Sequence, residues 1–301
     1  MEKIITRTHY NCREIFAKVG MSLYVVGIRV QIQHRFHDHD ATELVVVTKG
    51  RGWHATRTEE HPIEAGDVFV IREQDQHSYR DTRDLALYNV VFDLAQLHLP
   101  IHDLDTSPGF RALFSIEPRL RSTHGVRSRL RLSPANLTVV CDLLDNIDKE
   151  LDRKRFGYRC MASSLFMQVV GYLSRCYSSI EDPESRALLR LGPVLDHMES
   201  ALDQPIRLDD LARLVNMSKS TFQRAFRRTL NTSPFDYLIR LRIQKACESL
   251  ATGDQSVKEV AAAVGFDDSN YFTRQFRRIM GSSPRDYRHH ALHAGDCCQK
   301  T

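Results

Sequence analysis

The sequence has no long hydrophobic run. No stretch of its 301 residues approaches the roughly 18 consecutive apolar residues of a membrane-spanning helix. The N-terminus carries no apolar segment followed by a small-residue cleavage site, so no secretory signal is indicated. Cysteine is sparse: the seven residues, an odd number, form no CxxC pair, which argues against a disulfide framework or a zinc ribbon. We expect a cytoplasmic protein with reduced thiols, no cofactor and no membrane partner.

The sequence also lacks a large excess of charge of either sign, because its formal net charge is only +4. The excess is uneven along the chain. Residues 186–290 carry 17 Lys and Arg against 12 Asp and Glu, whereas residues 1–185 carry 24 against 25. A basic C-terminal third is typical of a nucleic-acid-binding module, although this excess alone discriminates weakly.

The C-terminal third contains an internal repeat at an offset of 50 residues, with nine identities in sixteen positions. The identical residues in the first copy are Phe222, Arg224, Phe226, Arg227, Arg228, Ser233, Pro234, Asp236 and Tyr237. They recur as Phe272, Arg274, Phe276, Arg277, Arg278, Ser283, Pro284, Asp286 and Tyr287.

Each copy predicts two helices around a tight turn, which is the helix-turn-helix arrangement. In the first copy, residues 208–216 have apolar side chains at helical spacing, and Ser218 has the chemistry of an N-cap for the helix that follows. In the second copy, Ser256 and Glu259 have the spacing of a capping box, and Gly265 ends the helix.

A third helix is expected between the copies, from Pro234 to just before Gly253. Its apolar positions predict a connector packed against both units: Leu238, Leu241, Ala246 and Leu250.

Placed on a helical wheel, the second helix of each copy has one apolar face and one polar face. The apolar faces are Phe222, Phe226 and Leu230 in the first copy and Phe272, Phe276 and Met280 in the second. The polar faces are Ser220, Gln223, Arg224, Arg227 and Arg228, and Asn270, Thr273, Arg274, Arg277 and Arg278. Arg, Gln and Asn match base edges in the major groove, and further Arg, Ser and Thr hold phosphates. For a single helix of this kind, a polar face that is merely solvent-exposed explains the pattern equally well. Two copies with matching faces favour binding to double-stranded DNA.

The last hundred residues resemble the DNA-binding domain of the AraC/XylS family of bacterial transcription regulators, and residues 261–288 depart little from the family pattern. The resemblance implies that the two units enter successive major grooves on one face of the duplex. A connector of about 18 residues spans roughly 27 Å, less than one DNA turn of about 34 Å, so some DNA bending is expected. By the resemblance, base reading falls on Ser220, Gln223 and Arg224, and on Ser269, Asn270, Thr273 and Arg274.

The N-terminal part predicts an antiparallel β-barrel, because short β-rich runs alternate with turns from residue 22 to residue 92. Two motifs resemble those of cupins: His37, His39, Glu43 and Gly50, then Pro62, Gly66, Asp67 and His77. The sequence departs from the cupin pattern in lacking a glycine before His37 and in the charged run 72–76. AraC-type sensor domains are cupins of this kind, and residues 37–89 resemble especially the rhamnose-responsive members.

Three interpretations remain open for His37, His39, Glu43 and His77. They would ligate a divalent metal such as iron, manganese, nickel or zinc. In the second interpretation, they line a pocket that hydrogen-bonds the hydroxyls of an effector such as a sugar. In the third interpretation, these side chains only hydrogen-bond one another inside the barrel and bind no ligand. Trp53, the only tryptophan, is either a stacking platform for a sugar ring or part of the core.

Two helices are expected between the domains, from about residue 133 to 151 and from 158 to 176. The first has a seam of Leu137, Val140, Leu144, Ile147 and Leu151, and the second a face of Met161, Leu165, Val169, Tyr172 and Cys176. In AraC-type proteins this pair is where subunits meet, so the resemblance implies a homodimer. The arginine-rich run 119–131 is expected to be a surface loop, with a second nucleic-acid contact as the alternative.

The expected fold is α+β with two domains. Its segments are a cupin-like sensor barrel (1–132), a helical pair (133–177), a linker (178–188), a DNA-binding domain with two helix-turn-helix units (189–290) and a tail (291–301). The expected function is an effector-controlled transcriptional activator that is not an enzyme and has RNA polymerase as a partner. Two alternatives remain: a metal-dependent cupin enzyme fused to a DNA-binding domain, and an architectural DNA binder with an inert barrel.

Overall fold

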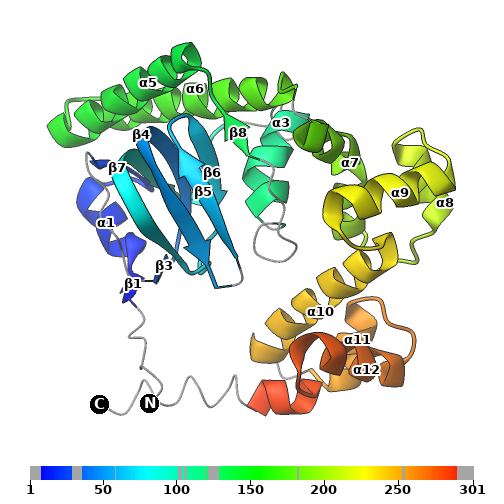
Figure 1. Ribbon diagram of the computed structural model, residues 1–301. Coiled ribbons are helices and arrows are strands. Elements are labelled where there is room, and N and C mark those ends of the chain that lie inside the picture. The colour runs from blue at the N-terminus through cyan, green and yellow to red at the C-terminus, as the bar shows by residue number, and fades with distance from the viewer. Residues whose placement is uncertain are drawn as a thin grey trace. The chain divides into compact units, whose positions relative to one another are not determined.

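The computed structural model (Figure 1) describes residues 8–28, 36–57, 59–100, 104, 107–118, 120, 129–181, 183–252 and 255–289. The tail at 291–301 and most of the arginine-rich run 119–131 lie outside these residues. The chain divides into an N-terminal unit, Met1–Leu189, and a C-terminal unit, Arg190–Thr301, which are described separately. Within the described residues, no helix has the length and apolar character needed to span a bilayer.

The N-terminal unit combines strands with helices. Its elements are β1 (Thr8–Tyr10), α1 (Cys12–Val19), β2 (Leu23–Ile28), β3 (His37–His39), β4 (Thr42–Thr56), β5 (Glu60–Glu64), β6 (Asp67–Ile71), β7 (His77–Phe92), α2 (Leu94–Leu97), α3 (Pro108–Phe110), the π-helical turn η1 (Arg111–Ile116), β8 (Leu130–Arg131), α5 (Pro134–Arg153) and α6 (Tyr158–Ser178).

The described strands form one eight-stranded sheet that is not closed into a barrel. Its order is β1-β3-β7-β4-β6-β8, with β2 also paired to β7 and β5 to β4. This corrects the expectation of a barrel, and the pairing of β1 with β3 is parallel rather than antiparallel. The expected runs on either side of Gly50 are a single strand, β4, which is irregularly paired with β7 between Val47 and Trp53. Such bulges bend a long strand, so β4 contributes residues to two parts of the sheet.

The two faces of β4 enter different apolar clusters, as strand alternation requires. Leu44 and Val46 belong to a large cluster that includes residues of α5 and α6, the green helices that lie across one side of the sheet in Figure 1. Val45 and Val47 belong to a second cluster with Phe69, among others. The sheet therefore has a helix-covered face and an opposite face with its own core.

The predicted seam of α5 is confirmed at the four positions that the structure buries: Val140, Leu144, Ile147 and Leu151. On the predicted face of α6, Val169 is buried and Met161 is 50 % exposed, and the structure also buries Phe166, which the predicted face did not include. The ring of Phe166 lies 5.0 Å from that of Phe92, at the end of β7. Contact with the sheet as well as with α5 thus sets the buried face of α6, and helical spacing alone does not reveal this second surface.

The C-terminal unit is helical. Beyond α7 (Pro183–Ser200), it contains α8 (Leu208–Leu214), α9 (Lys219–Leu230), α10 (Pro234–Thr252), α11 (Val257–Ala263) and α12 (Ser269–Met280). Helix α7 begins inside the segment predicted as the linker 178–188, and the division between the units falls within this helix. The polar composition of residues 178–185 suggested a loop, but buried Leu188 and Leu191 belong to the same helical surface as Leu195.

The sequence repeat corresponds to repeated contacts. The rings of Phe226 and Tyr237 lie 5.6 Å apart at 75°, and those of Phe276 and Tyr287 lie 5.6 Å apart at 73°. After α9 and after α12, a serine hydroxyl accepts a hydrogen bond from the backbone and donates to an aspartate: Ser233 with Asp236, and Ser283 with Asp286. Most of the identities between the copies are thus residues that build the same fold twice.

The predicted caps of the helix-turn-helix units are confirmed. The Ser218 hydroxyl accepts from the backbone N–H of Thr221 at 3.3 Å. Ser256 and Glu259 form a reciprocal capping box. On the predicted apolar face of α12, Met280 is 39 % exposed, unlike its buried counterpart Leu230 in α9. Leu214, one of the residues at helical spacing in the first copy, is 45 % exposed.

The buried phenylalanines give a stability prediction. Phe226→Ala and Phe276→Ala should each lower the free energy of unfolding of the C-terminal unit by about 3–5 kcal/mol, because each leaves a cavity in a fully buried site. Far-UV circular dichroism during denaturant unfolding measures the loss. Met280→Ala is the control and should change stability little, because its side chain is partly exposed. Unchanged unfolding of both phenylalanine variants would contradict the assigned helix faces.

Candidate functional site

The second helix of the first copy, α9, presents its predicted polar face to solvent. Ser218 caps its start, and buried Phe222, Phe226 and Leu230 hold the opposite face against the unit. The five predicted contact residues are all exposed: Ser220, Gln223, Arg224, Arg227 and Arg228. The helix therefore offers forked donors and acceptors along one side, as recognition of base edges and phosphates requires.

Helix α12 repeats this arrangement with local differences. Asn270, Arg274, Arg277 and Arg278 are exposed, whereas Ser269 and Thr273 are half-buried. The Thr273 hydroxyl donates to the Ser269 carbonyl at 2.8 Å, so its proton is directed into the helix. The Arg274 guanidinium lies 5.8 Å from the centre of the Tyr271 ring, which helps to hold the side chain extended.

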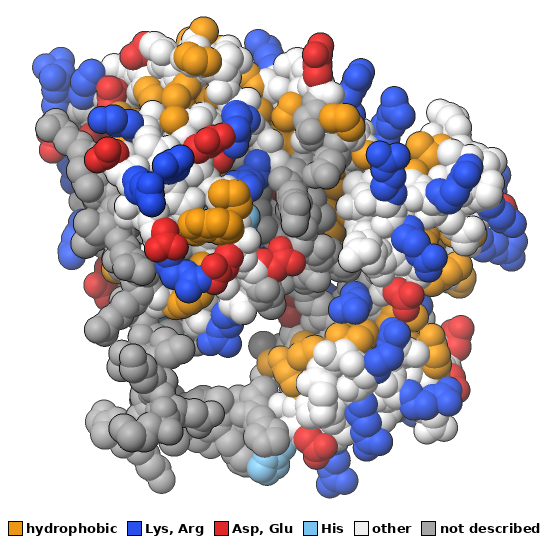
Figure 2. Space-filling view, in the orientation of Figure 1, with side chains coloured by type: hydrophobic (Ala, Val, Ile, Leu, Met, Phe, Trp, Pro, Cys, Tyr) orange, Lys and Arg blue, Asp and Glu red, His pale blue; other side chains and the backbone are white. Residues whose placement is uncertain are grey.

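Arg278 differs from its counterpart Arg228 in a contact with the connector. Its Nη2 lies 3.3 Å from Asp236 Oδ1, near the start of α10. The pKa of Asp236 is lowered from its usual value, first by the hydrogen bond from Ser233 and then by Arg278. This exposed ion pair links α12 to α10, the helix that connects the two copies of the repeat. Lys and Arg side chains project from the C-terminal unit on the face seen in Figure 2.

A buried polar cluster lies in the N-terminal unit, where β3, β4 and β7 bring His39, Glu43 and His77 together. The Nε2 atoms of His39 and His77 lie 3.0 Å and 3.4 Å from the same oxygen of Glu43. All three side chains are almost wholly buried. Alternation along β4 places Glu43 on the same face as Val45 and Val47, so strand geometry and the cupin resemblance agree on its inward direction.

Backbone carbonyls fix the orientation of both imidazoles. His39 Nδ1 lies 2.6 Å from the Ala41 carbonyl, and His77 Nδ1 lies 3.3 Å from that of Asp75. A carbonyl only accepts, so the Nδ1 proton of His39 is used there, and its Nε2 can donate to Glu43 only as an imidazolium. Burial alone would lower the pKa of His39, but the hydrogen bond to Glu43 and its charge raise it. Burial alone would raise the pKa of Glu43, but the hydrogen bond with His39 and the nearby imidazole of His77 lower it well below its usual range.

The ring of His37 also lies in this cluster. Its ring centre lies 4.1 Å from that of His77, and Tyr10 packs edge-on against it at 5.3 Å. The structure thus brings together all four predicted polar residues. Among the described residues, His39, Glu43 and His77 are the one group of three whose possible ligand atoms all lie within 4.8 Å of one another.

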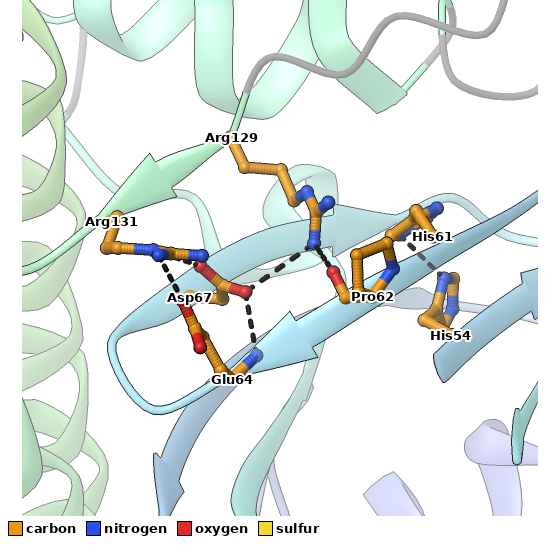
Figure 3. A network of polar contacts seen from close by, with 7 residues as sticks. All are labelled: His54, His61, Pro62, Glu64, Asp67, Arg129 and Arg131. Carbon is orange, nitrogen blue, oxygen red and sulfur yellow. Dashed lines mark hydrogen bonds and ion pairs between the residues drawn. The ribbon is translucent and has the colours of Figure 1, made fainter. Parts of the chain in front are cut away.

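Three further residues belong to the cluster although the sequence did not indicate them. His54 is 1 % exposed, and its Nδ1 lies 3.2 Å from His61 Nε2, a pair visible in Figure 3. Its ring centre lies 5.6 Å from that of His77. Tyr79 is also buried, and its hydroxyl has no hydrogen-bond partner among the residues that the structure describes. Burial, followed by the charge of Glu43, raises the pKa of Tyr79. Only knowledge of the β4–β5 and β4–β7 registers would have identified them, because His54 lies opposite both His61 and Tyr79.

The arrangement can hold a divalent cation or hydrogen-bond a polar ligand. Two imidazoles whose Nδ1 atoms face carbonyls, with both Nε2 atoms directed at one carboxylate, have the outer contacts that orient metal ligands. The same groups, with the Tyr79 hydroxyl, provide donors and acceptors for hydroxyl groups.

Trp53 is not part of this cluster. It neighbours His54 on β4, so its side chain projects from the opposite face of the strand. It is 41 % exposed, which rules out the interpretation of Trp53 as a core residue.

Comparison with known proteins finds two matching families, one for each unit. Residues 22–170 match the family described as AraC-like ligand binding domain, and residues 211–290 match the one described as Helix-turn-helix domain. The chain is 30 % identical over 258 residues to the HTH-type transcriptional activator RhaR of Cronobacter sakazakii, covering 84 % of this chain and 86 % of that protein. It is 29 % identical over 284 residues to RhaR of Enterobacter sp., covering 93 % and 96 %.

Among solved structures, the chain is similar to the DNA-binding domain of AdpA in complex with a target DNA. The identity is 35 %, the match covers 36 % of this chain and 91 % of that one, and the TM-score is 0.30.

The buried cluster predicts a dependence of stability on Glu43. Glu43→Ala should lower the free energy of unfolding of the N-terminal unit by about 3–5 kcal/mol, because two buried imidazoles lose their carboxylate. Fluorescence of Trp53, the only tryptophan, follows unfolding of this unit selectively. Glu73→Ala removes an exposed carboxylate of the same unit and should leave the transition in place. If the two variants unfold alike, the cluster contributes nothing to stability.

Proposed function

Because the chain belongs to the AraC family of DNA-binding transcription regulators, we propose that it activates transcription at a specific DNA site under the control of a small polar effector. The observation that carries the DNA-binding half of the proposal is the matched pair of reading helices, α9 and α12. Each exposes its polar face because equivalent phenylalanines bury the other.

Base reading is assigned to Ser220, Gln223 and Arg224 on α9, and to Ser269, Asn270, Thr273 and Arg274 on α12. Arg227, Arg228, Arg277 and Arg278 would contact phosphates, with Arg278 also holding the connector. Successive major grooves would receive the two helices, and the protein would act in the cytoplasm.

Control of transcription by the effector is assigned to the N-terminal unit. His37, His39, Glu43 and His77 would hydrogen-bond a ligand rich in hydroxyl groups, because imidazole and carboxylate provide both donors and acceptors. A sugar fits this chemistry better than a fatty ligand. The relatives named above are transcriptional activators, which supports activation and an encounter with RNA polymerase as the outcome.

A homodimer through the α5–α6 pair is part of the proposal. Large apolar side chains are exposed on these helices: Val139 is 41 % exposed and Met161 50 %, and Phe156 lies in the turn between them. A second copy of the pair would cover these groups.

The second candidate is a metal-dependent cupin enzyme joined to a DNA-binding unit, which the convergence of His39, Glu43 and His77 favours. Metal analysis of protein purified without added metal separates the two. A stoichiometric ion together with turnover of a substrate favours the enzyme, whereas metal-free protein that responds to an effector favours the regulator. An architectural protein with an inert sensor unit would show no effector response at all.

The DNA-binding proposal is tested by Arg224→Ala and Arg274→Ala. Each should cost about 1–3 kcal/mol of binding free energy at the cognate site, and less on unrelated DNA, if the guanidinium grips a guanine edge. Titration of both DNA sequences at one salt concentration measures the difference. Arg213→Ala, which removes an exposed arginine of α8 paired with Asp210, is the matched control. Equal losses on both sequences would mean that the two arginines contact phosphates only.

The sensing proposal is tested by His37→Ala. This variant should lose the effector's influence on transcription, while its DNA affinity without effector stays within about threefold of the parent, because each unit has its own core. The effector is first identified by a thermal-shift screen of sugars and related metabolites. A normal response in His37→Ala would place sensing elsewhere in the protein.

A further inference from the structure

A second candidate site lies on the face of the sheet opposite the histidine cluster. It is a pocket of about 700 Å³ whose lining includes Arg51, Trp53, Arg83, Arg129 and Arg131, and it is called the arginine pocket below. Arg51 and Trp53 project from the outer face of β4, next to Glu64 and Pro62 of β5 in the register. The arginine pocket shares no residue with the histidine cluster.

The buried carboxylate of Asp67 holds two of the arginines, Arg129 and Arg131, in position. Asp67 is 1 % exposed, and its Oδ1 accepts from Arg131 Nε at 2.9 Å. Its Oδ2 lies 3.5 Å from Arg129 Nη1, which also donates to the carbonyl of Pro62. Figure 3 shows both side chains reaching from β8 and the residue before it toward β5 and β6. Because buried Asp67 holds them, these guanidinium groups are preorganised at the rim of the pocket.

The other two arginines face each other without a carboxylate partner. Arg51 of β4 is paired with Arg83 of β7 in the register, and both side chains are exposed. Like charges directly opposite on neighbouring strands destabilise a sheet. Among the ion pairs of the residues that the structure describes, none includes Arg51 or Arg83. An anion between them would remove this repulsion.

Trp53 gives the pocket an apolar platform. Its indole is 41 % exposed in the middle of a strand, among arginines and beside Pro62. An exposed indole of this kind stacks on the C–H face of a sugar ring. Glu64 and Asp81 also line the pocket and can accept hydrogen bonds from hydroxyl groups.

We propose that the arginine pocket binds an anionic carbohydrate, a sugar ring that carries a carboxylate or a phosphate group. The anionic group lies between Arg51 and Arg83, the ring stacks on Trp53, and the ring hydroxyls donate to Glu64 and Asp81. The two acidic side chains would repel the phosphates of a nucleic-acid backbone, which offers no hydrogen-bond donors to them. They suit a ligand with several hydroxyl groups, which can donate to both. This site goes beyond the effector function assigned to the histidine cluster, and it can be present or absent independently of that function.

Fluorescence of the full-length protein tests the site directly, because Trp53 is the only tryptophan. The probes are D-glucuronate, D-glucose 6-phosphate and neutral D-glucose, at constant ionic strength. A saturable change with either anionic sugar and none with glucose is expected, and the stronger of the two responses tells whether the site prefers a carboxylate or a phosphate.

Arg51→Gln and Arg83→Gln should each weaken the response by about tenfold or more, because a charge-assisted hydrogen bond is lost. Arg57→Gln, which removes an exposed arginine of the same unit outside the pocket, should leave binding unchanged. DNA affinity should be the same in all three variants. The proposal is overturned by an equal response to glucose, by no saturable response to either anion, or by binding that survives both pocket variants. A loss of DNA affinity in Arg51→Gln and Arg83→Gln would identify the pocket as a nucleic-acid contact instead.

Discussion

The burial of paired phenylalanines in the two reading helices is the constraint on which the DNA-binding account depends. Phe222 and Phe226 in α9, and Phe272 and Phe276 in α12, are fully buried. Because a helix that buries one side must expose the other, these four rings determine which side chains can reach DNA. The rings of Phe226 and Phe276 pack against Tyr237 and Tyr287 in the same geometry. The fold of each copy therefore presents its polar face in the same way.

In the N-terminal unit, the alternation of strand β4 separates two kinds of chemistry. Glu43 and His54 project inward, toward a buried cluster of imidazoles whose charge is balanced by one carboxylate. Arg51 and Trp53 project outward, into a basic pocket held in place by buried Asp67. Uninterrupted alternation would place Glu43 on the same face as Arg51 and Trp53. The irregular pairing between Val47 and Trp53 reverses this, because an extra residue in β4 shifts the alternation by one position. One strand thus carries both candidate ligand sites of the unit.

Much of the helical architecture was predictable from the sequence, because caps and helical spacing are local signals. Ser218, Ser256 and Gly265 marked helix ends that the structure has. The errors arose where tertiary contacts decide. The predicted face of α6 omitted Phe166, which the structure buries against the sheet. The spacing of the strands along the sequence led us to expect a closed barrel. Spacing alone does not determine whether the two edge strands of a sheet pair with each other. His54 joined the cluster only through registers that no local pattern reveals. Trp53, its neighbour on β4, lies on the opposite face of the strand and outside the cluster.

Hydroxyl-radical footprinting of the full-length protein on its cognate site measures most directly whether two equivalent helices read the DNA. The account predicts two protected stretches on one face of the duplex, about 10 base pairs apart for each bound subunit, one for α9 and one for α12. A single protected stretch per subunit, or protection on opposite faces of the duplex, would contradict it.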